Sequence, residues 1–264
     1  MAAVTIASAP SFKRIEVAPA YQRVADAIER EIVNGRIKPG DPIGTESELV
    51  QQFGVNRSTV REGIRVLEEG GLIRRDSSRR LYACMPRYNK LASRLSRALV
   101  LHEVTFRELY ETAIILEIAA IEYAVDHATD DDIGEIAANI EKTEQAVANP
   151  ALFAELDADF HVLIAKASHN RVLQLAREPA GLLFFPTTEM VVRDVAEGMP
   201  RLIAAHHHLL DAIRKRDKEA GKVWMRRHVE DWRRGFERAG NSLDRPVERM
   251  YMEHALVTQK RLGA

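Results

Sequence analysis

Apolar residues recur at helical spacing along most of the chain. Between Tyr21 and Asn34 they return every three or four positions, and Gly35 follows as a stop signal. From about Leu91 to Gly240 the same periodicity continues with few strand signals. The pattern therefore predicts a mainly α-helical protein whose long C-terminal part is an all-α helical bundle.

A different pattern occupies residues 45–85. Thr45 and Glu48 form a capping box before a short helix, which Gly54 ends, and Asn56 can cap a second helix. A Gly-Gly break follows, and then the segment RRDSSRRLYAC, whose centre favours a turn. Two helices joined by a tight turn and followed by a hairpin predict a winged helix-turn-helix.

The second of these helices has a basic side. At about 100° per residue, Arg57, Arg61 and Arg65 fall on one arc, with Ser58 and Thr59 near the helix start. The planar arginine fork can donate two hydrogen bonds to a guanine edge in the major groove, and hydroxyl groups suit phosphates. A solvated face balanced by glutamates is the alternative for three arginines alone. With the preceding helix, the caps and the hairpin included, the arrangement favours DNA binding.

The hairpin carries arginines on both sides of its tip. We predict that Arg79 and Arg80 reach phosphates or the minor groove, and we add Thr45, at the start of the first helix, to the DNA-binding set. A charged hairpin edge that resists aggregation accounts for the same arginines. The two interpretations are compatible.

Composition excludes several classes of protein. The chain has 264 residues, of which 46% are hydrophobic and 29% charged, as in folded globular proteins. It contains no run of about 18 apolar residues, so we expect no membrane span. Its N-terminus lacks the basic segment of a secretory signal, and the single Cys84 excludes an internal disulfide and a cysteine-based zinc site. We expect a cytoplasmic protein.

Charge and pattern divide the chain. Residues 1–90 hold 15 Lys and Arg against 11 Asp and Glu, whereas residues 91–264 hold 23 against 28, which suggests a polyanion partner for the first part. We predict a flexible arm at 1–19, a winged helix-turn-helix DNA-binding domain at 20–85, a linker and connecting helix at 86–104, an all-helical metal- and effector-binding domain at 105–240, and a C-terminal extension at 241–264.

One carboxylate and three histidines in the C-terminal part are candidate metal ligands. Asp157 and His161 are four residues apart and share a helix face. The apolar side chains of a later helix have a mean direction that points at His206, whereas the next two histidines point elsewhere, and His228 lies on the apolar face of the last long helix. In a bundle core these four side chains can meet and bind a divalent metal with open coordination positions. Neutral core histidines bonded to their neighbours are the alternative.

The first part of the chain resembles the winged helix-turn-helix domain of GntR-family bacterial transcription regulators. The resemblance covers residues 21–83 and rests on the segments GRIKPGD, ELVQQFGVNR and VREGIRVLEEGGLI, which occur in this order. It implies that Arg57 and Arg61 contact bases. Two positions depart from the family pattern: Ser47 stands where many members have a basic residue, and Arg80 stands where the wing usually has a glycine.

Residues 105–235 resemble the FCD-type effector domain of the FadR subfamily. This resemblance rests on the segments DFHVLIAKASHN, HHHLLDAIRKRD and MRRH. It implies that Asp157, His161, His206 and His228 bind a divalent metal ion. We expect zinc, with nickel, manganese or iron as alternatives. It also implies that the effector is often a carboxylate that completes the metal shell.

Ala113 is a departure within this second resemblance. Many metal-binding members have an arginine there that pairs with the effector's carboxylate, so a different cation has to serve here. Arg193 is our candidate, although a surface arginine is the alternative. Asn170 matches the A-S-x-N turn and is a second candidate, with helix capping as its alternative.

These observations predict a ligand-responsive transcription regulator. We expect a homodimer that binds double-stranded operator DNA, represses a catabolic operon and is released by a small carboxylate or sugar-acid metabolite. A metal-dependent hydrolase or lyase that uses the same Asp and three His is the alternative, and a purely structural metal is a third. The sequence places no convincing general base beside the site, and an enzyme would have no use for the winged helix. We therefore expect no catalytic activity.

Overall fold

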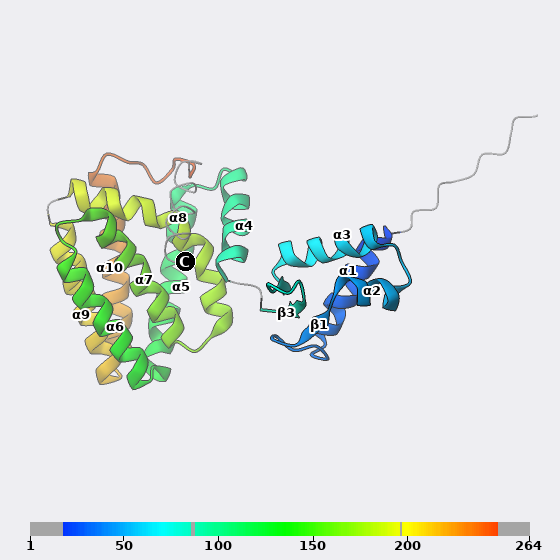
Figure 1. The fold of residues 1–264 in the computed structure, drawn as a ribbon. Coiled ribbons are helices and arrows are strands. Elements are labelled where there is room, and N and C mark those ends of the chain that lie inside the picture. The colour runs from blue at the N-terminus through cyan, green and yellow to red at the C-terminus, as the bar shows by residue number, and fades with distance from the viewer. Residues whose placement is uncertain (1–17, 86–87, 196, 248–264) are drawn as a thin grey trace, which may run out of the picture. The chain divides into compact units, whose positions relative to one another are not determined.

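The chain forms two compact units, residues 1–87 and 88–264, in a computed structural model that describes residues 18–85, 88–195 and 197–247 (Figure 1). Most of the predicted arm at 1–19 lies outside the described residues, as does the predicted extension beyond residue 247. Within the described ranges, no helix is both long and apolar enough to cross a membrane.

The N-terminal unit combines helices with a small antiparallel sheet. Its elements are α1 (Ala20–Val33), β1 (Pro42–Gly44), α2 (Glu46–Phe53), α3 (Arg57–Gly70), β2 (Ile73–Arg75) and β3 (Leu81–Ala83). The sheet order is β1-β3-β2, with both pairings antiparallel. The predicted capping box of Thr45 and Glu48 and the predicted cap by Asn56 are confirmed. Gly54 and Gly71 end the two helices in the left-handed conformation.

Strand β1 lies in the segment RIKPGDPIG, whose prolines and glycines favour a turn-rich connector and not a strand. Pro42 is the Cα partner of Tyr82, and Gly44 is the partner of Leu81. Because β1 is an edge strand and Pro42 is its first residue, the missing N–H of proline is tolerated there. Pairing with β3 therefore creates a strand that the local pattern does not indicate.

Helix α3 lies against α1 at a glycine. A Cβ on Gly63 would come within 2.9 Å of the Tyr21 carbonyl oxygen and 3.1 Å of the Val24 Cγ1 atom. The core beside this crossing is formed by buried apolar side chains, among them Ile28, Leu49, Val60, Ile64, Leu67 and Leu81. This packing holds α3 in place while its arginine side faces solvent.

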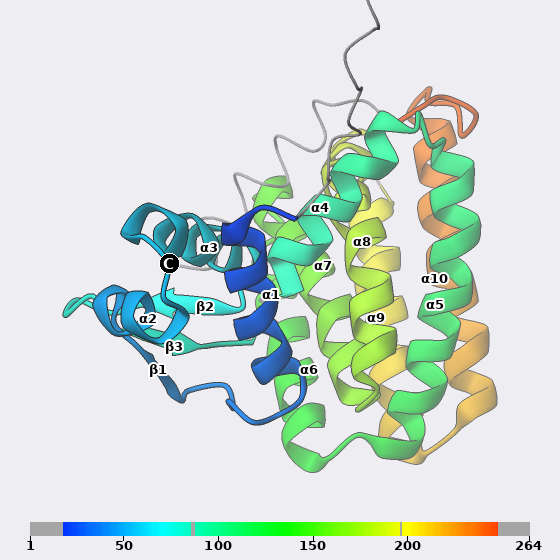
Figure 2. The ribbon, with the colours of Figure 1, turned by 90° about the vertical axis from the view of Figure 1, so that its right-hand side faces the viewer.

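The described part of the C-terminal unit is helical, as predicted. Its elements are α4 (Tyr88–Leu101), α5 (Phe106–His127), α6 (Asp130–Gln145), α7 (Pro150–Ala167), α8 (Arg171–Asp194), α9 (Gly198–Lys215) and α10 (Lys218–Arg238). Helices α5 and α10 run side by side, as Figure 2 shows, and α9 packs on α10 and α6. Threonines cap two of these helices in capping boxes, Thr105 with Glu108 and Thr129 with Asp132.

The predicted connecting helix, α4, packs on α8 and belongs to this unit. The Ser96 hydroxyl donates a hydrogen bond to the Pro179 carbonyl oxygen at 3.0 Å. The main core lies among α5, α6, α7, α9 and α10, with Ile121, Phe160 and Leu209 fully buried. Helices α5, α7, α8, α9 and α10 supply the candidate site described next.

Candidate metal centre and DNA-binding surface

The structure brings together the four side chains that the sequence selects as metal ligands. One ligand atom from each of Asp157, His161, His206 and His228 can be chosen so that all four atoms lie within 4.8 Å of one another. The Nε2 atoms of His161 and His228 are 3.1 Å apart, and the Nε2 atom of His206 is 3.3 Å from the Asp157 Oδ1 atom. Helix α7 supplies two of these residues, and α9 and α10 supply one each.

Burial distinguishes His206 from its neighbours, as the helical spacing predicts. His206 has no exposed surface and stacks on Phe160 with ring centroids 3.5 Å apart. His207 is exposed and contacts Glu144 at 2.8 Å, and His208 is exposed and stacks on Trp224. The predicted phase of this helix is therefore confirmed.

Several polar atoms of the cluster have no hydrogen-bond partner among the described residues. They are the Asp157 Oδ1 atom and both ring nitrogens of His206, all buried; Oδ1 and Nε2 lie 3.3 Å apart, but not in the geometry of a hydrogen bond. Leaving such groups unpaired costs about 1–3 kcal/mol each. Burial, with the nearby His206 and His161, lowers the pKa of His228 to about 3, and burial lowers the pKa of His206 as well. Burial would lower the pKa of His161, but Glu117 and Asp157 outweigh it and raise this pKa. Three imidazoles and a carboxylate around one point are the donor set that a divalent cation such as zinc prefers, so the residues fit a metal.

A second carboxylate orients His161. The Nδ1 atom of His161 lies 2.9 Å from the Glu117 Oε2 atom, and the Arg177 Nε atom donates to the Glu117 Oε1 atom at 2.7 Å. Burial alone would raise the pKa of Glu117, but Arg177 and His161 outweigh it and lower the pKa to about 2. A carboxylate that holds the Nδ1 proton directs the Nε2 lone pair toward the other ligands, as is usual for metal-binding histidines.

Sequence reasoning did not identify Glu117 or Arg177. Both are buried, and they come from α5 and α8, 60 positions apart. A signal was present for Glu117, because it is the one charged residue within the apolar run AIILEIAAI. Its partner could not be inferred from the sequence alone, since nothing in the local pattern connects the two helices.

A cavity of about 690 Å³ opens beside the cluster. Asp157, His161 and His228 line it, together with Ala113, Glu117 and Arg177. The volume is in the range that holds a small organic ligand. A small organic molecule bound in this cavity would lie within reach of both the ligand cluster and the buried Arg177.

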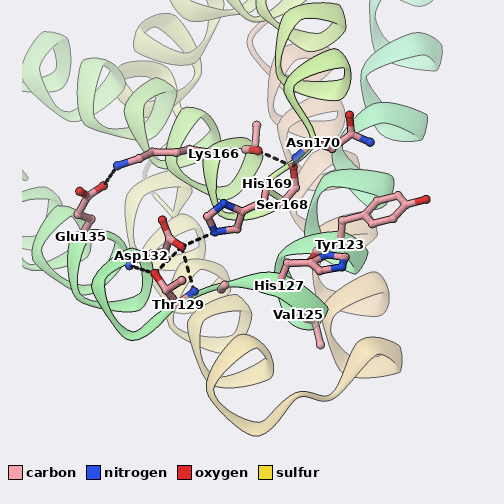
Figure 3. Close-up of polar contacts among 12 residues, drawn as sticks. Tyr123, Val125, His127, Thr129, Asp132, Glu135, Lys166, Ser168, His169 and Asn170 are labelled. Carbon is pink, nitrogen blue, oxygen red and sulfur yellow. Dashed lines mark hydrogen bonds and ion pairs between the residues drawn. The ribbon is translucent and has the colours of Figure 1, made fainter.

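The two sequence candidates for effector binding lie elsewhere. Arg193 is exposed, pairs with Asp194 at 3.0 Å and is not among the residues that line the cavity. Asn170 lies at the turn between α7 and α8, next to His169 and Ser168 (Figure 3), and its side chain accepts hydrogen bonds from two backbone N–H groups at the start of α8. In the structure Arg193 is a surface arginine and Asn170 caps α8, and neither lines this cavity.

The three arginines of α3 are exposed but not equally available. Arg65 forms ion pairs with Glu62 and Glu69, and the Arg57 Nη2 atom donates to the Ser47 Oγ atom at 3.1 Å. Arg61 is exposed and has no polar partner among the described residues. Of the three, Arg61 is therefore the one whose guanidinium is fully available to a base edge.

The other residues predicted to bind DNA lie on α3 itself, at the start of α2 and in the wing. Ser58 is exposed and donates to the Asn56 Oδ1 atom, whereas Thr59 is half-buried. The Thr45 hydroxyl is occupied in part by its capping box. Arg79 and Arg80 are exposed at the wing tip.

The wing has two features that its sequence did not reveal. The backbone φ of Arg79 is 65°, so a non-glycine residue takes the left-handed conformation next to the position where the resembled family has glycine. The Arg75 side chain contacts Glu46 at 2.9 Å and Glu68 at 3.4 Å, which ties the wing to α2 and α3.

Comparison with known sequences identifies both units. The family profile of bacterial regulatory proteins of the gntR family matches residues 20–82, and the profile of the FCD domain matches residues 108–231. Together they cover the helix-turn-helix, the wing and the helices that carry the metal-ligand candidates.

Individual relatives agree with this assignment. The chain is 28% identical over 221 residues to an uncharacterized HTH-type transcriptional regulator, YdhC, of Bacillus subtilis, covering 82% of this chain and 91% of that protein. It is 25% identical over 213 residues to the HTH-type transcriptional repressor NanR of Escherichia coli K12, covering 79% of this chain and 81% of NanR. A solved GntR structure from Streptococcus agalactiae has a similar fold, with a TM-score of 0.58, 21% identity and coverage of 81% of this chain and 99% of that one.

Proposed function

We propose a function from the premise that this chain belongs to the GntR family of bacterial regulatory proteins and carries an FCD domain in its C-terminal unit. It is a DNA-binding transcription regulator and not an enzyme, in line with relatives that are named as transcriptional regulators. We propose further that it represses a catabolic operon and that a small carboxylate metabolite, bound in the C-terminal cavity, releases it from its operator.

The observation that carries this proposal is the cluster of Asp157, His161, His206 and His228 beside the cavity. A bound cation would satisfy its buried polar atoms that make no hydrogen bond. Zinc suits three imidazoles and one carboxylate, with nickel, manganese or iron as alternatives. A bound divalent cation would supply positive charge at the cavity floor that favours an anionic ligand. Glu117 and Arg177 hold His161 in the required orientation.

The DNA-binding role falls to α3 and the wing. Arg61 would donate to a base edge, Arg57 would do so after leaving Ser47, and Arg65 would contact the backbone. Thr45, Ser58, Thr59, Arg79 and Arg80 would contact phosphates. A homodimer would place two copies of α3 on a pseudo-palindromic operator about one helical turn apart.

Regulation requires that the metabolite bind two states of the protein unequally. A ligand that contacts α5, α8 and α10 at once would favour the arrangement of these helices that fits it best. If that arrangement binds the operator poorly, operator DNA in turn lowers the affinity of the protein for the metabolite by the same factor. The amount of release is therefore set by the difference between the two metabolite affinities.

The metal-dependent hydrolase or lyase finds no support, because the relatives are regulators. A purely structural cation is a distinct alternative. In that case, removal of the cation lowers the stability of the unit but leaves the response to the metabolite unchanged in the protein that remains folded.

A selection experiment tests the proposal. Genomic fragments retained by the zinc-loaded full chain would define the operator, and fluorescence anisotropy would then measure its affinity while a panel of small carboxylates is added. We expect at least one carboxylate to weaken operator binding by tenfold or more. No enrichment of any fragment, or an operator affinity that none of the acids changes, would contradict the proposal.

A further inference from the structure

A bound divalent cation and the Arg177 guanidinium would both lie at the cavity floor. Asp157 belongs to the ligand cluster, and Glu117 contacts both His161 and Arg177. Glu155, Asp159 and Glu178 line the cavity as well, and Glu178 lies 3.8 Å from the Arg177 Nη1 atom. A buried guanidinium with a donor group to spare favours an anionic partner from a ligand.

Arg177 is built to contact that ligand. Among the described residues its guanidinium donates from Nε to Glu117, and Nη2 makes no hydrogen bond. Gly181, one turn later on α8, leaves room for this group, because a Cβ there would lie 3.1 Å from the Nη2 atom. Glycine inside a helix costs about 1 kcal/mol relative to alanine. Both residues line the cavity, so this space serves the free end of the arginine fork.

The walls above the floor are mainly apolar. They include Leu116, Leu182, Val191, Val192, Trp224 and Trp232, and Thr188 adds a hydroxyl. Among the charged residues that also line the cavity, Arg201 pairs with Asp231 and Arg234 with Glu230. No ion pair within the described residues involves the remaining ones, which are Glu155, Asp159, Glu197, Arg227 and Arg238. Hydroxyl groups of a ligand that face the apolar part of the walls would lose their hydration there, whereas an apolar body would gain by burial.

We infer that the effector is a monocarboxylate with a bulky apolar body, aromatic or branched alkyl. Arg177 pairs with its carboxylate, because position 113 holds an alanine and no arginine. The inference rests on the proposed function, because it assigns the ligand of the same cavity. It excludes the sugar acids, which the sequence analysis includes among the expected effectors.

Calorimetric titration of the zinc-loaded full chain with three probes tests the ligand class. The probes are 3-phenylpropanoate, its neutral amide and D-gluconate, which differ in charge or in body but are of similar size. We expect 3-phenylpropanoate to bind at least about tenfold more tightly than either of the other two. If gluconate binds as tightly as 3-phenylpropanoate, or more tightly, the claim that the ligand has an apolar body is wrong. If the acid and its amide bind with equal affinity, the claim that the cavity recognises a carboxylate is wrong.

Two variants on α8 test the role of Arg177. Arg177→Lys keeps the positive charge but loses the planar fork, and we expect it to retain zinc while its affinity for 3-phenylpropanoate falls by about tenfold or more and its affinity for the amide does not change. Arg193→Lys is the matched control on the exposed side of the same helix, and it should behave as the wild type. An unchanged ratio of acid to amide affinity in Arg177→Lys would mean that Arg177 only positions Glu117, which overturns its role as the anchor.

Failure of this inference can be distinguished from failure of the proposed function. If gluconate binds best and weakens operator binding, the inference is wrong and the regulator function stands. If none of the probes binds the zinc-loaded chain, the inference is overturned, and the proposed function is then decided by whether any carboxylate of the panel changes operator affinity.

Discussion

Zinc should stabilise the C-terminal unit through His206 and not through its neighbour His207. His206 is fully buried in the ligand cluster, whereas His207 is exposed and contacts Glu144 on the surface. Replacement of either residue by alanine removes one imidazole from the same helix. The two variants therefore differ in whether the imidazole faces the metal-ligand candidates.

The expected size of the effect follows from binding linkage. Free zinc at about 100 times its dissociation constant adds about 2.7 kcal/mol to the free energy of unfolding. For a unit of this size, that corresponds to a rise of about 5–11 °C in the melting temperature. An affinity loss of about a hundredfold in His206→Ala would leave about 0.4 kcal/mol at the same zinc concentration, which is a shift of about 1 °C.

Differential scanning calorimetry of each protein with zinc and with a chelator measures this difference. Each variant serves as its own reference, because His206→Ala also removes the stacking on Phe160 and lowers the stability of the metal-free unit. We expect the full zinc-dependent shift in His207→Ala and a shift of only about 1 °C in His206→Ala. A full shift in His206→Ala, or equal loss in both variants, would refute the assignment of the ligands.

Further predictions concern each unit in turn. Arg61→Ala should abolish operator specificity in the folded dimer, whereas Arg65→Ala, which removes an arginine already paired with two glutamates, should cost less; anisotropy with specific and scrambled duplexes measures both. Gly63→Ala should destabilise the N-terminal unit by about 1–3 kcal/mol, because the added Cβ would press on the α1 backbone, whereas Gly70 has open space around it and Gly70→Ala should not. Urea unfolding measures both variants, and equal stability of the two would contradict the close packing at Gly63. The Glu117 carboxyl, whose pKa falls from 4.5 to about 2 on folding, contributes about 3 kcal/mol that is complete above pH 4.5 and is lost as the pH falls through about 2. Glu117→Gln should therefore be less stable at pH 7 and show a shallower acid dependence between pH 4.5 and 2, and an unchanged slope would contradict the buried ion pair.

Helical periodicity was sufficient to place the ligand candidates on the correct faces. The direction of His206 follows from the apolar side chains around it, and the spacing of Asp157 and His161 puts them on one side of α7. The caps at Thr45 and Asn56 were also predictable, because capping depends on residues within four positions. These features are local, so the sequence alone contains them.

Features that depend on distant partners were not predictable. Strand β1 exists because β3 pairs with it, and its own residues, which include a proline and a glycine, favour a turn. Glu117 is recognisable as a charge in an apolar run, but Arg177 has a role only because α8 brings it beside α5. Arg193 was a candidate to replace the arginine that is missing at position 113, and the helix turns it to the surface.

The most direct test of the account measures operator release with and without the cation. Fluorescence anisotropy would follow a labelled operator duplex bound by the full chain, either zinc-loaded or stripped with a chelator, during titration with 3-phenylpropanoate. The account predicts release from the zinc-loaded protein at an acid concentration at least about tenfold below that needed for the stripped protein. Release at the same acid concentration from both forms would contradict the claim that the Asp157 and histidine cluster binds the effector through a metal.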